Sequence, residues 1–294
     1  MRRAYLFPGQ GFQYIGMGKK LYDESSLARE YFERANELLG YRITDFMFRG
    51  PIEKLFETRV TQNAIFLVSL ISALKEGDDF NPSMVAGHSL GETTALVANG
   101  VLSFEDGLLL MDERAIEMEK AFRAVPAMMV AVLGLEDEII ERICEEVGEL
   151  VVPANYNCPG QLVIAGRDRE VEKAILLLAK AGARRIVELH VGGAVHSPLM
   201  KPVANYLERK LASITFNEPR CPIYPNVTGV ATTDLNEIRH CLTMQQVQAL
   251  RWTTTIQNMM LDGASDFVDC GPPHVISGMV RRISKKVHIN SAVM

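Results

Sequence analysis

Short apolar runs alternate with longer segments of helical periodicity along most of the chain. Apolar runs over 4–7 and 83–86 predict buried strands. The apolar positions over 27–39 and 61–74 instead follow a helical period. The last third predicts helices at 234–248, 253–261 and 273–283, and strands at 222–226, 267–270 and 287–289. Strands that alternate with helices indicate a layered α/β fold around a mostly parallel sheet.

The middle of the chain has a different order of elements. It predicts strands at 128–133, 150–154, 161–165 and 184–189, with helices at 137–147 and 169–181. This βαββαβ order is that of a ferredoxin-like split βαβ unit. Proline and glycine mark both junctions, near Pro126 and Gly192. We therefore predict a large α/β domain made of residues 1–125 and 192–294, into which a small ferredoxin-like domain, residues 126–191, is inserted.

The sequence Gly87-His88-Ser89-Leu90-Gly91 lies between a predicted strand and a predicted helix over 92–99. G-x-S-x-G in this context is typical of the nucleophile elbow of α/β hydrolases. The glycines let the strand and the helix pass close to each other. The serine then stands at a helix N-terminus, where free N–H groups and the helix dipole favour a developing oxyanion. The alternative is a glycine-rich turn with an incidental serine, but the flanking elements favour an elbow in an α/β-hydrolase-like domain.

His196 is the best candidate for a base that activates Ser89. It follows a glycine-rich loop and precedes Ser197 and Pro198, which are good first residues for a helix. It also lies downstream of the serine, which is the chain order found in α/β hydrolases. The alternative for any single histidine is a purely structural role.

Arg114 lies in the middle of a helix that the pair Ser103 and Asp106 is expected to cap. From periodicity alone, a surface arginine on an amphipathic helix is the simpler interpretation, because unpaired arginines are seldom buried.

Composition and charge exclude several classes of protein. The chain has 294 residues, of which 48% are hydrophobic and 23% charged, and its net charge is −5. We expect no nucleic-acid partner, because no basic stripe occurs. We expect no membrane span, because no apolar run reaches the ~20 residues that a span needs. The N-terminus lacks the apolar region of a signal peptide. Five scattered cysteines without C-x-x-C spacing argue against disulfides and structural zinc. We therefore expect a cytoplasmic protein without a metal site.

Six short motifs occur in order along nearly the whole chain. They are Phe7-Pro8-Gly9-Gln10-Gly11, Gly87-His88-Ser89-Leu90-Gly91-Glu92, Asn155-Tyr156-Asn157-Cys158-Pro159-Gly160-Gln161, Gly193-Ala194-Val195-His196-Ser197-Pro198-Leu199-Met200, Pro225-Asn226-Val227 and Arg251-Trp252-Thr253. Together they resemble the malonyl-CoA–acyl carrier protein transacylases, the acyltransferases that load malonyl groups in bacterial fatty acid synthesis.

The resemblance implies a ping-pong reaction. The malonyl group would pass from malonyl-CoA to Ser89, the nucleophile, and then to the phosphopantetheine thiol of acyl carrier protein. His196 would be the general base and would later protonate the leaving thiol. No cofactor of the protein's own is implied, because the carrier protein brings the phosphopantetheine. We expect a monomer.

The resemblance also implies the roles of the surrounding residues, and it replaces the surface interpretation of Arg114. A planar guanidinium can hold a substrate carboxylate with two hydrogen bonds. The implied site residues are the oxyanion-binding N–H groups of Gln10 and Leu90, the carboxylate-binding Arg114, the further substrate-binding residues Gln62, Asn157 and Val195, and Gln245, which would orient His196 through a neutral acceptor.

Three positions depart from the usual pattern of the family. Val195 stands where relatives usually have phenylalanine or another larger residue, which predicts a wider pocket and less strict selection of malonyl. Asn63 replaces a usual proline, and Gly271-Pro272-Pro273-His274 replaces a more glycine-rich loop.

Three other functions stay open on the sequence alone. The chain could be the freestanding acyltransferase of a polyketide synthase, an acyl hydrolase on the same site, or a non-catalytic binding protein. Arg114 and the missing triad acid argue against the hydrolase. The intact Ser89, His196 and Arg114 argue against the binding protein.

Overall fold

The first of two sheets is built from four parallel strands. β1 (Arg2–Phe7) lies between β2 (Met84–Gly87) and β7 (Ala264–Asp269), and β8 (His288–Ser291) pairs with the outer side of β7. The structure is a computed structural model and describes residues 2–11, 13–272 and 275–292. All three strand pairs are parallel, which confirms the α/β class predicted from the sequence.

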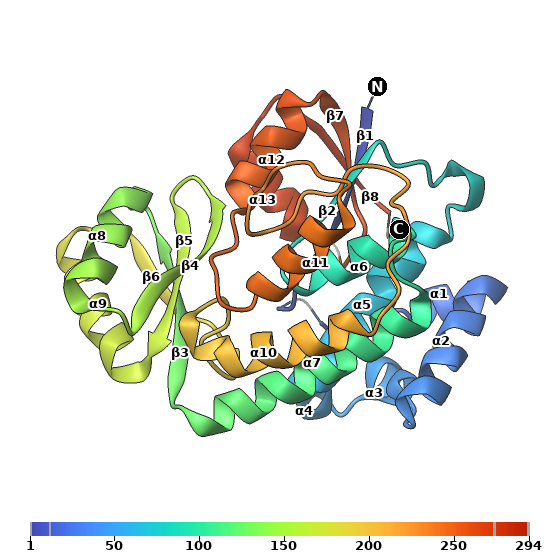
Figure 1. Cartoon of the computed structure of the whole chain (residues 1–294), viewed down its shortest axis with the longest axis horizontal. Helices are drawn as coiled ribbons and strands as arrows, with labels where there is room; N and C mark the ends of the chain where they lie inside the picture. Colours follow the sequence, from blue (N-terminus) through green and yellow to red (C-terminus); the bar gives the residue numbers. More distant parts are fainter. Residues whose placement is uncertain (1, 12, 273–274, 293–294) are drawn as a thin grey trace.

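Helices surround this sheet and make up most of the large domain (Figure 1). They are α1 (Lys19–Glu24), α2 (Ser26–Leu39), α3 (Ile43–Arg49), α4 (Ile52–Leu55), α5 (Thr58–Leu74), α6 (Leu90–Ala98), α7 (Phe104–Ala124), α10 (Lys201–Ala212), α11 (Leu235–Met244), α12 (Trp252–Leu261) and α13 (Val275–Ile283). Helix α5 is buried on every side from Val60 to Ala73, as expected for a helix whose apolar residues are not confined to one face. It packs against α6 and α7.

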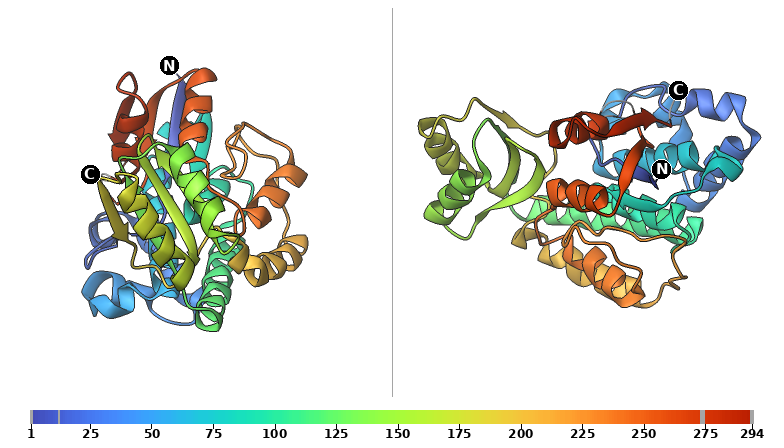
Figure 2. Two further views of the ribbon diagram at one scale, coloured as in Figure 1. Left: turned by 90° about the vertical axis from the view of Figure 1, so that its left-hand side faces the viewer. Right: turned by 90° about the horizontal axis from the view of Figure 1, so that it is seen from above.

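The second sheet is antiparallel and belongs to the predicted insertion. Its strands β3 (Ala127–Leu133), β4 (Val151–Cys158), β5 (Gln161–Arg167) and β6 (Arg185–Glu188) pair in the order β4-β5-β3-β6. Helices α8 (Asp137–Val147) and α9 (Asp168–Lys180) complete the ferredoxin-like βαββαβ unit expected from the sequence. Figure 2 shows this small domain to one side of the large one.

The two faces of the small sheet have different partners. Val130 and Val132 on β3 point to the side covered by α8 and α9 and form a core of their own. Met129 and Ala131 alternate with them and join the core of the large domain. The small sheet therefore presents a wall toward the large domain.

Some predicted elements are wrong in extent. Residues 222–226, predicted as a strand, make only isolated bridges through Ile223, because Pro222 and Pro225 have no N–H to donate to a ladder. Strand β4 continues to Cys158, beyond the predicted end of this strand at residue 154, because partners in β5 and at Leu250 stabilise the extended chain. The first two residues of the predicted helix 273–283 lie outside the described residues.

Helix α6 starts in close contact with the sheet, and this requires glycine at two positions. A Cβ atom on Gly87 would overlap the carbonyl group of Gly91, and one on Gly91 would overlap the carbonyl oxygen of Phe7. The chain between them turns at Ser89, whose φ of 53° and ψ of −115° are rare for a residue other than glycine.

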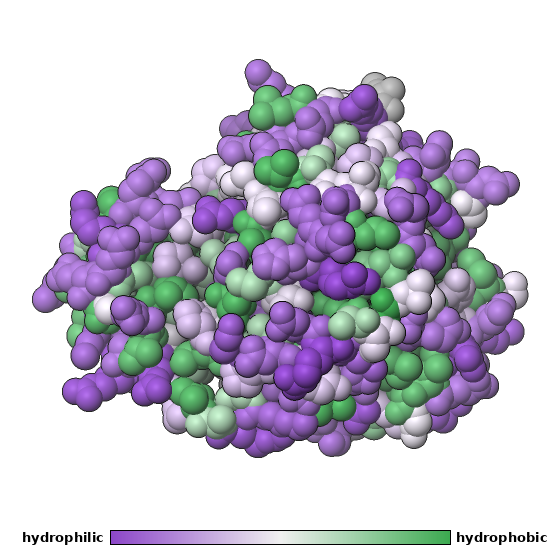
Figure 3. All heavy atoms as spheres, viewed as in Figure 1, coloured by the Kyte–Doolittle hydropathy of each residue, from purple (hydrophilic) through white to green (hydrophobic). Residues whose placement is uncertain are grey.

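The surface is mostly hydrophilic on the face in Figure 3, with apolar side chains in small separate groups. Across the part of the chain that the structure describes, no helix combines the length and the apolar character needed to cross a membrane. Within the same residues, no group of three or more histidine, cysteine, aspartate or glutamate side chains could hold a metal ion.

We expect Gly87→Ala to destabilise the protein by about 3 kcal/mol, because its methyl group has no space against Gly91. Urea unfolding measures this. Gly278→Ala is the matched control. It adds the same methyl group inside a helix where no atom lies within 4 Å, and we expect equal or slightly higher stability. Equal stability of the two variants would contradict the close approach of β2 and α6.

Candidate active site

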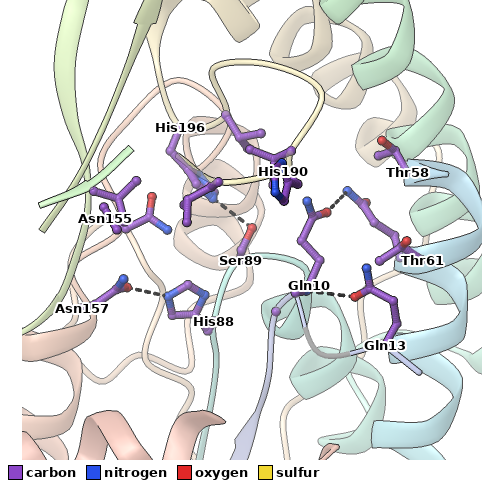
Figure 4. A pocket seen from close by; sticks show the side chains of 18 of the residues that line it. Gln10, Gln13, Thr58, Thr61, His88, Ser89, Asn155, Asn157, His190 and His196 are labelled. Atoms are coloured by element: carbon purple, nitrogen blue, oxygen red, sulfur yellow. Dashed lines mark hydrogen bonds between the residues drawn. The ribbon is translucent and has the colours of Figure 1, made fainter. Parts of the chain in front are cut away.

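A cavity of about 650 Å³ lies in front of Ser89, between the large domain and the wall of the small sheet. It is lined by the loop after β1, α5, the turn between β2 and α6, strands β3 to β5, residues 188–196 and α13. Figure 4 shows Ser89 and His196 turned toward each other, with Asn155 and Asn157 on one side and Gln10 on the other.

Ser89 is the N-cap residue of α6 and is partly exposed to the cavity. Its strained backbone is held by Asn226, whose Oδ1 accepts from the Ser89 N–H at 2.8 Å and whose Nδ2 donates to the Gly87 carbonyl at 2.6 Å. The Ser89 N–H is therefore occupied. The N–H of Leu90, the first helical residue, has no intrahelical acceptor and can bind an anion at this point.

His196 is hydrogen-bonded on both sides of its ring. Nε2 lies 2.9 Å from Ser89 Oγ, and Nδ1 lies 2.6 Å from the main-chain carbonyl oxygen of Gln245. A carbonyl oxygen can only accept, so Nδ1 carries the proton and Nε2 accepts from the Ser89 hydroxyl. Only 2% of His196 is exposed, and this burial lowers its pKa to about 3, because the charged imidazolium would lose its hydration. The imidazole is therefore neutral and available as a base.

Two local features aim the ring and its acceptor. His196 has a φ of 59°, and Ser197 stabilises the turn by donating to the Ala194 carbonyl at 2.7 Å and capping the short 3-10 helix Pro198–Met200. Helix α11 ends at Met244 and not at residue 248 as predicted. Gln245 therefore lies at the helix end, and its carbonyl is available to His196.

The loop after β1 passes directly beside the serine. A Cβ atom on Gly9 would lie 3.0 Å from the His88 carbonyl oxygen and 3.7 Å from Ser89 Cβ. This close approach brings the backbone of Gln10 to the cavity, and the Gln10 side chain accepts a hydrogen bond from Gln62 Nε2 at 3.2 Å. The backbone of Gln10 and that of Leu90 thus come from two elements that meet at Ser89.

Arg114 is buried in the large domain, with 3% of it exposed. Nη1 donates to Gln62 Oε1 at 2.7 Å and Nε donates to Gln246 Oε1 at 3.1 Å. Nη2 is also buried and has no partner among the residues that the structure describes. Burial lowers the pKa of Arg114 to about 10, so the side chain remains a cation at neutral pH. The surface position suggested by helical periodicity is wrong.

Arg114 is not among the residues that line the cavity, whereas the other predicted substrate residues are. Val195 is buried beside His196. Gln62 is buried, and both ends of its amide are engaged. Asn157 is also buried, and its Oδ1 lies 2.9 Å from His88 Nε2, so this oxygen already has a partner. The amide nitrogen of Asn157 is left for a ligand.

The sequence prediction missed three buried residues behind the serine and the histidine: Glu92, Asn226 and Gln246. Glu92 Oε2 accepts from the Asn226 N–H at 2.8 Å and from Gln245 Nε2 at 3.0 Å. Burial raises the pKa of Glu92 to about 7. Asn226 lies in a recognised motif, but no local pattern indicates that its amide reaches 137 residues back along the chain to Ser89.

One of the three unusual positions, Asn63, has a structural explanation, and in the late loop the structure describes only the part that keeps the usual Gly-Pro sequence. Asn63 donates to Asp112 Oδ1 at 2.7 Å, and the same carboxylate forms an ion pair with Arg59, so that α5 and α7 are braced together. Gly271 packs so closely on Pro8 that a Cβ atom would overlap the proline ring. Pro273 and His274 lie outside the described residues.

A serine on a strand–turn–helix elbow, bonded to a neutral histidine in an α/β fold, is the arrangement used by serine-dependent acyl-transfer enzymes. Fold and site define that class for this chain. Comparison with known sequences agrees, since the acyl transferase domain family matches residues 4–291. Malonyl CoA-acyl carrier protein transacylases of Bacillus subtilis (strain 168) and Escherichia coli (strain K12) are 37% and 38% identical to it. The matches cover 97% and 95% of this chain, and 91% and 92% of those proteins. The chain therefore belongs to the acyl transferase family of malonyl CoA-acyl carrier protein transacylases.

Solved structures are similar over the same length. An acyl carrier protein S-malonyltransferase from Vibrio cholerae is 37% identical, with a TM-score of 0.94 over 99% of this chain and 96% of that one. A malonyl-transacylase in complex with its type II PKS acyl-carrier protein is 36% identical, also with a TM-score of 0.94 and with the same coverage.

We expect Ser89 to react with a fluorophosphonate probe at a rate that changes less than about threefold between pH 7 and pH 5. Burial favours the neutral imidazole of His196, so the pH must fall toward 3 before the base is protonated. A histidine with the ordinary pKa near 6.5 would lose about twentyfold over this range. Mass spectrometry of the labelled protein gives the rate, with Ser89→Ala as the unreactive control. A loss of rate centred between pH 6 and 7 would contradict the assigned pKa.

Proposed function

We propose that this chain transfers the malonyl group of malonyl-CoA to the phosphopantetheine thiol of acyl carrier protein, through an acyl-enzyme on Ser89. The observation that carries the proposal is a buried guanidinium next to the cavity of an activated serine. Arg114 does not itself line the cavity, but Gln62, to which its Nη1 donates, does, and its Nη2 has no partner among the described residues. No carboxylate among the described residues forms a direct ion pair with Arg114, and a substrate with a free carboxylate would provide one. The names of the relatives support this substrate and this carrier.

Acylation begins with the hydrogen bond between Ser89 and His196. Ser89 Oγ attacks the thioester carbonyl carbon while His196 Nε2 takes the hydroxyl proton. The carbonyl oxygen becomes an oxyanion, which the N–H groups of Leu90 and Gln10 bind. When the tetrahedral intermediate collapses, the carbon–sulfur bond breaks and His196 returns the proton to the sulfur of coenzyme A.

Transfer to the carrier reverses these steps. The phosphopantetheine thiol gives its proton to His196 as its sulfur attacks the malonyl ester. The ester bond to Ser89 Oγ then breaks, and the proton returns to that oxygen. Both halves use one base and one oxyanion site, so the serine emerges unchanged and no cofactor of the protein's own takes part.

The neutral acceptor behind His196 supports transfer over hydrolysis. The Gln245 carbonyl orients the ring as a triad aspartate would, but it brings no negative charge to stabilise the imidazolium. We infer that the resulting base is too weak to activate water efficiently and is sufficient for a thiol, which is more acidic. The malonyl ester therefore persists until the carrier arrives.

The selectivity and the setting of the enzyme complete the proposal. Val195 places a small side chain in the cavity wall beside His196, and we propose that it admits malonyl groups with a small substituent. The pathway that we propose is fatty acid synthesis. The five cysteines are buried free thiols, which supports a cytoplasmic enzyme.

We expect Ser89→Ala to abolish covalent capture of malonyl from malonyl-CoA, because Ser89 supplies the hydroxyl that is hydrogen-bonded to His196 Nε2. Intact-protein mass spectrometry after incubation with malonyl-, methylmalonyl- and acetyl-CoA measures the adducts. Ser213→Ala, at an exposed serine, is the control and should load as the unaltered protein does. Malonyl trapped on Ser89→Ala would refute the nucleophile. Free malonate in place of carrier thioester would show a hydrolase.

We expect Arg114→Ala to lower malonyl transfer at least about a hundredfold, because the substrate carboxylate would be buried without a cation. Transfer of an acetyl group, which has no carboxylate, should change less than about threefold. Steady-state rates with both thioesters give the comparison. Arg123→Ala, at an exposed arginine of the same helix, serves as control. Equal losses for malonyl and acetyl would contradict the carboxylate site.

A further inference from the structure

Arg114 is held between two side-chain amides, and each leads to a different part of the acyl-transfer site. On one side, Nη1 donates to Gln62 Oε1 at 2.7 Å, and Gln62 Nε2 donates to Gln10 Oε1 at 3.2 Å. On the other side, Nε donates to Gln246 Oε1 at 3.1 Å. The guanidinium is thus positioned entirely by neutral groups.

The hydrogen bonds on the Gln246 side, called the Gln246 arm below, continue to the buried carboxyl group of Glu92. Gln246 Nε2 donates to the side-chain Oε1 of Gln245 at 3.3 Å, and Gln245 Nε2 donates to Glu92 Oε2 at 3.0 Å. The main chain of the same Gln245 holds His196 Nδ1. Gln245, Gln246 and Glu92 are each at most 1% exposed, so water does not screen this chain of contacts.

Three successive hydrogen bonds link Arg114 through Gln246 and Gln245 to Glu92, and all three run in the same direction. Each donor points from the Arg114 cation toward the Glu92 carboxyl group, which its pKa of about 7 leaves partly ionised at neutral pH. Each amide therefore turns its oxygen to the guanidinium side and its nitrogen to the carboxylate side. Amide dipoles aligned in this way stabilise both charges. A carboxylate in direct contact with Arg114 would stabilise the cation more strongly, but it would occupy the donors that a substrate needs.

We propose that Gln246 is a positioning residue that determines specificity: it holds Nε of Arg114 and leaves the Nη2 edge free for a substrate carboxylate, with Glu92 as a counter-charge at a distance. The inference rests on the proposed function, since the malonyl carboxylate is the ligand that Arg114 receives. Gln246 does not line the cavity and touches no reacting atom.

The test separates a role in carboxylate binding from a general structural role. Gln246→Leu keeps a side chain of similar size and removes the hydrogen bonds of the Gln246 side chain with Arg114, Gln245 and the Leu242 carbonyl. We expect the KM for malonyl-CoA to rise about tenfold, as for the loss of a hydrogen bond to a charged group, with a smaller change in kcat. Single-turnover acylation by acetyl-CoA should stay within about twofold of the unaltered protein, because acetyl does not use Arg114.

A second variant keeps the test decisive if Gln246→Leu does not fold. Gln246→Glu retains the shape and the oxygen that accepts from Arg114, and it adds a resident carboxylate. We expect this carboxylate to compete with the substrate and to raise the malonyl-CoA KM further than tenfold, with acetyl acylation retained. Gln248→Leu, at an exposed glutamine two residues along the chain, is the matched control and should leave both substrates unaffected.

Three results would overturn the inference. An unchanged malonyl-CoA KM in both Gln246 variants would show that Arg114 binds the substrate carboxylate equally well without the hydrogen bond to Gln246. Equal losses for malonyl and acetyl would show that Gln246 acts on the fold or on His196 alone. If the unaltered protein forms no malonyl-enzyme, the proposed function fails, and the inference fails with it. If malonyl-enzyme forms and the KM does not change, only the inference fails.

Discussion

A guanidinium buried without a carboxylate is the constraint around which this site is organised. Removing the Arg114 cation on α7 from water is costly, and two other segments of the large domain offset that cost: α5 through Gln62, and the chain just after α11 through Gln246. Its direct partners are neutral amides and Glu92 acts only at a distance, so the cation remains available to an anion. The same segments carry Gln10 and His196 through their hydrogen bonds, so carboxylate binding and acyl transfer share one framework.

Ser89 and His196 both have an unfavourable backbone conformation, which the rest of the fold must stabilise. Ser89 and His196 are the two residues other than glycine with positive φ in the described part of the chain. Each is stabilised by a buried polar side chain. Asn226 is hydrogen-bonded to the turn at Ser89, and the Ser197 hydroxyl is hydrogen-bonded to the turn at His196. Because the partner of the His196 ring is a main-chain carbonyl, its orientation is set by where a helix ends and not by a charged side chain. A neutral, oriented base follows from geometry alone.

The small domain forms one wall of the cavity, whereas the reacting side chains Ser89 and His196 belong to the large domain. One face of its sheet packs on its own helices, and the other closes the cavity opposite Ser89. Main-chain hydrogen bonds join it to the large domain, from Tyr156 to the Leu250 carbonyl and from Leu250 to the Ala154 carbonyl. Arg282 on α13 adds a contact with Gln161 at 3.0 Å near the cavity. The wall is therefore tied to the same segment, residues 245–250, that orients the histidine.

The sequence by itself determined the α/β class, the ferredoxin-like order of the insertion and the elbow at Ser89, because periodicity and glycine spacing act over a few residues. The places of Gln10, Arg114 and Gln245 followed only from resemblance to a family, and helical periodicity alone put Arg114 on the surface. The tertiary structure decided the rest. Asn226 reaches Ser89 across 137 residues, and Gln246 reaches Arg114 across 132. A buried polar contact of this kind leaves no local pattern, because its two partners are brought together only when the whole core has packed.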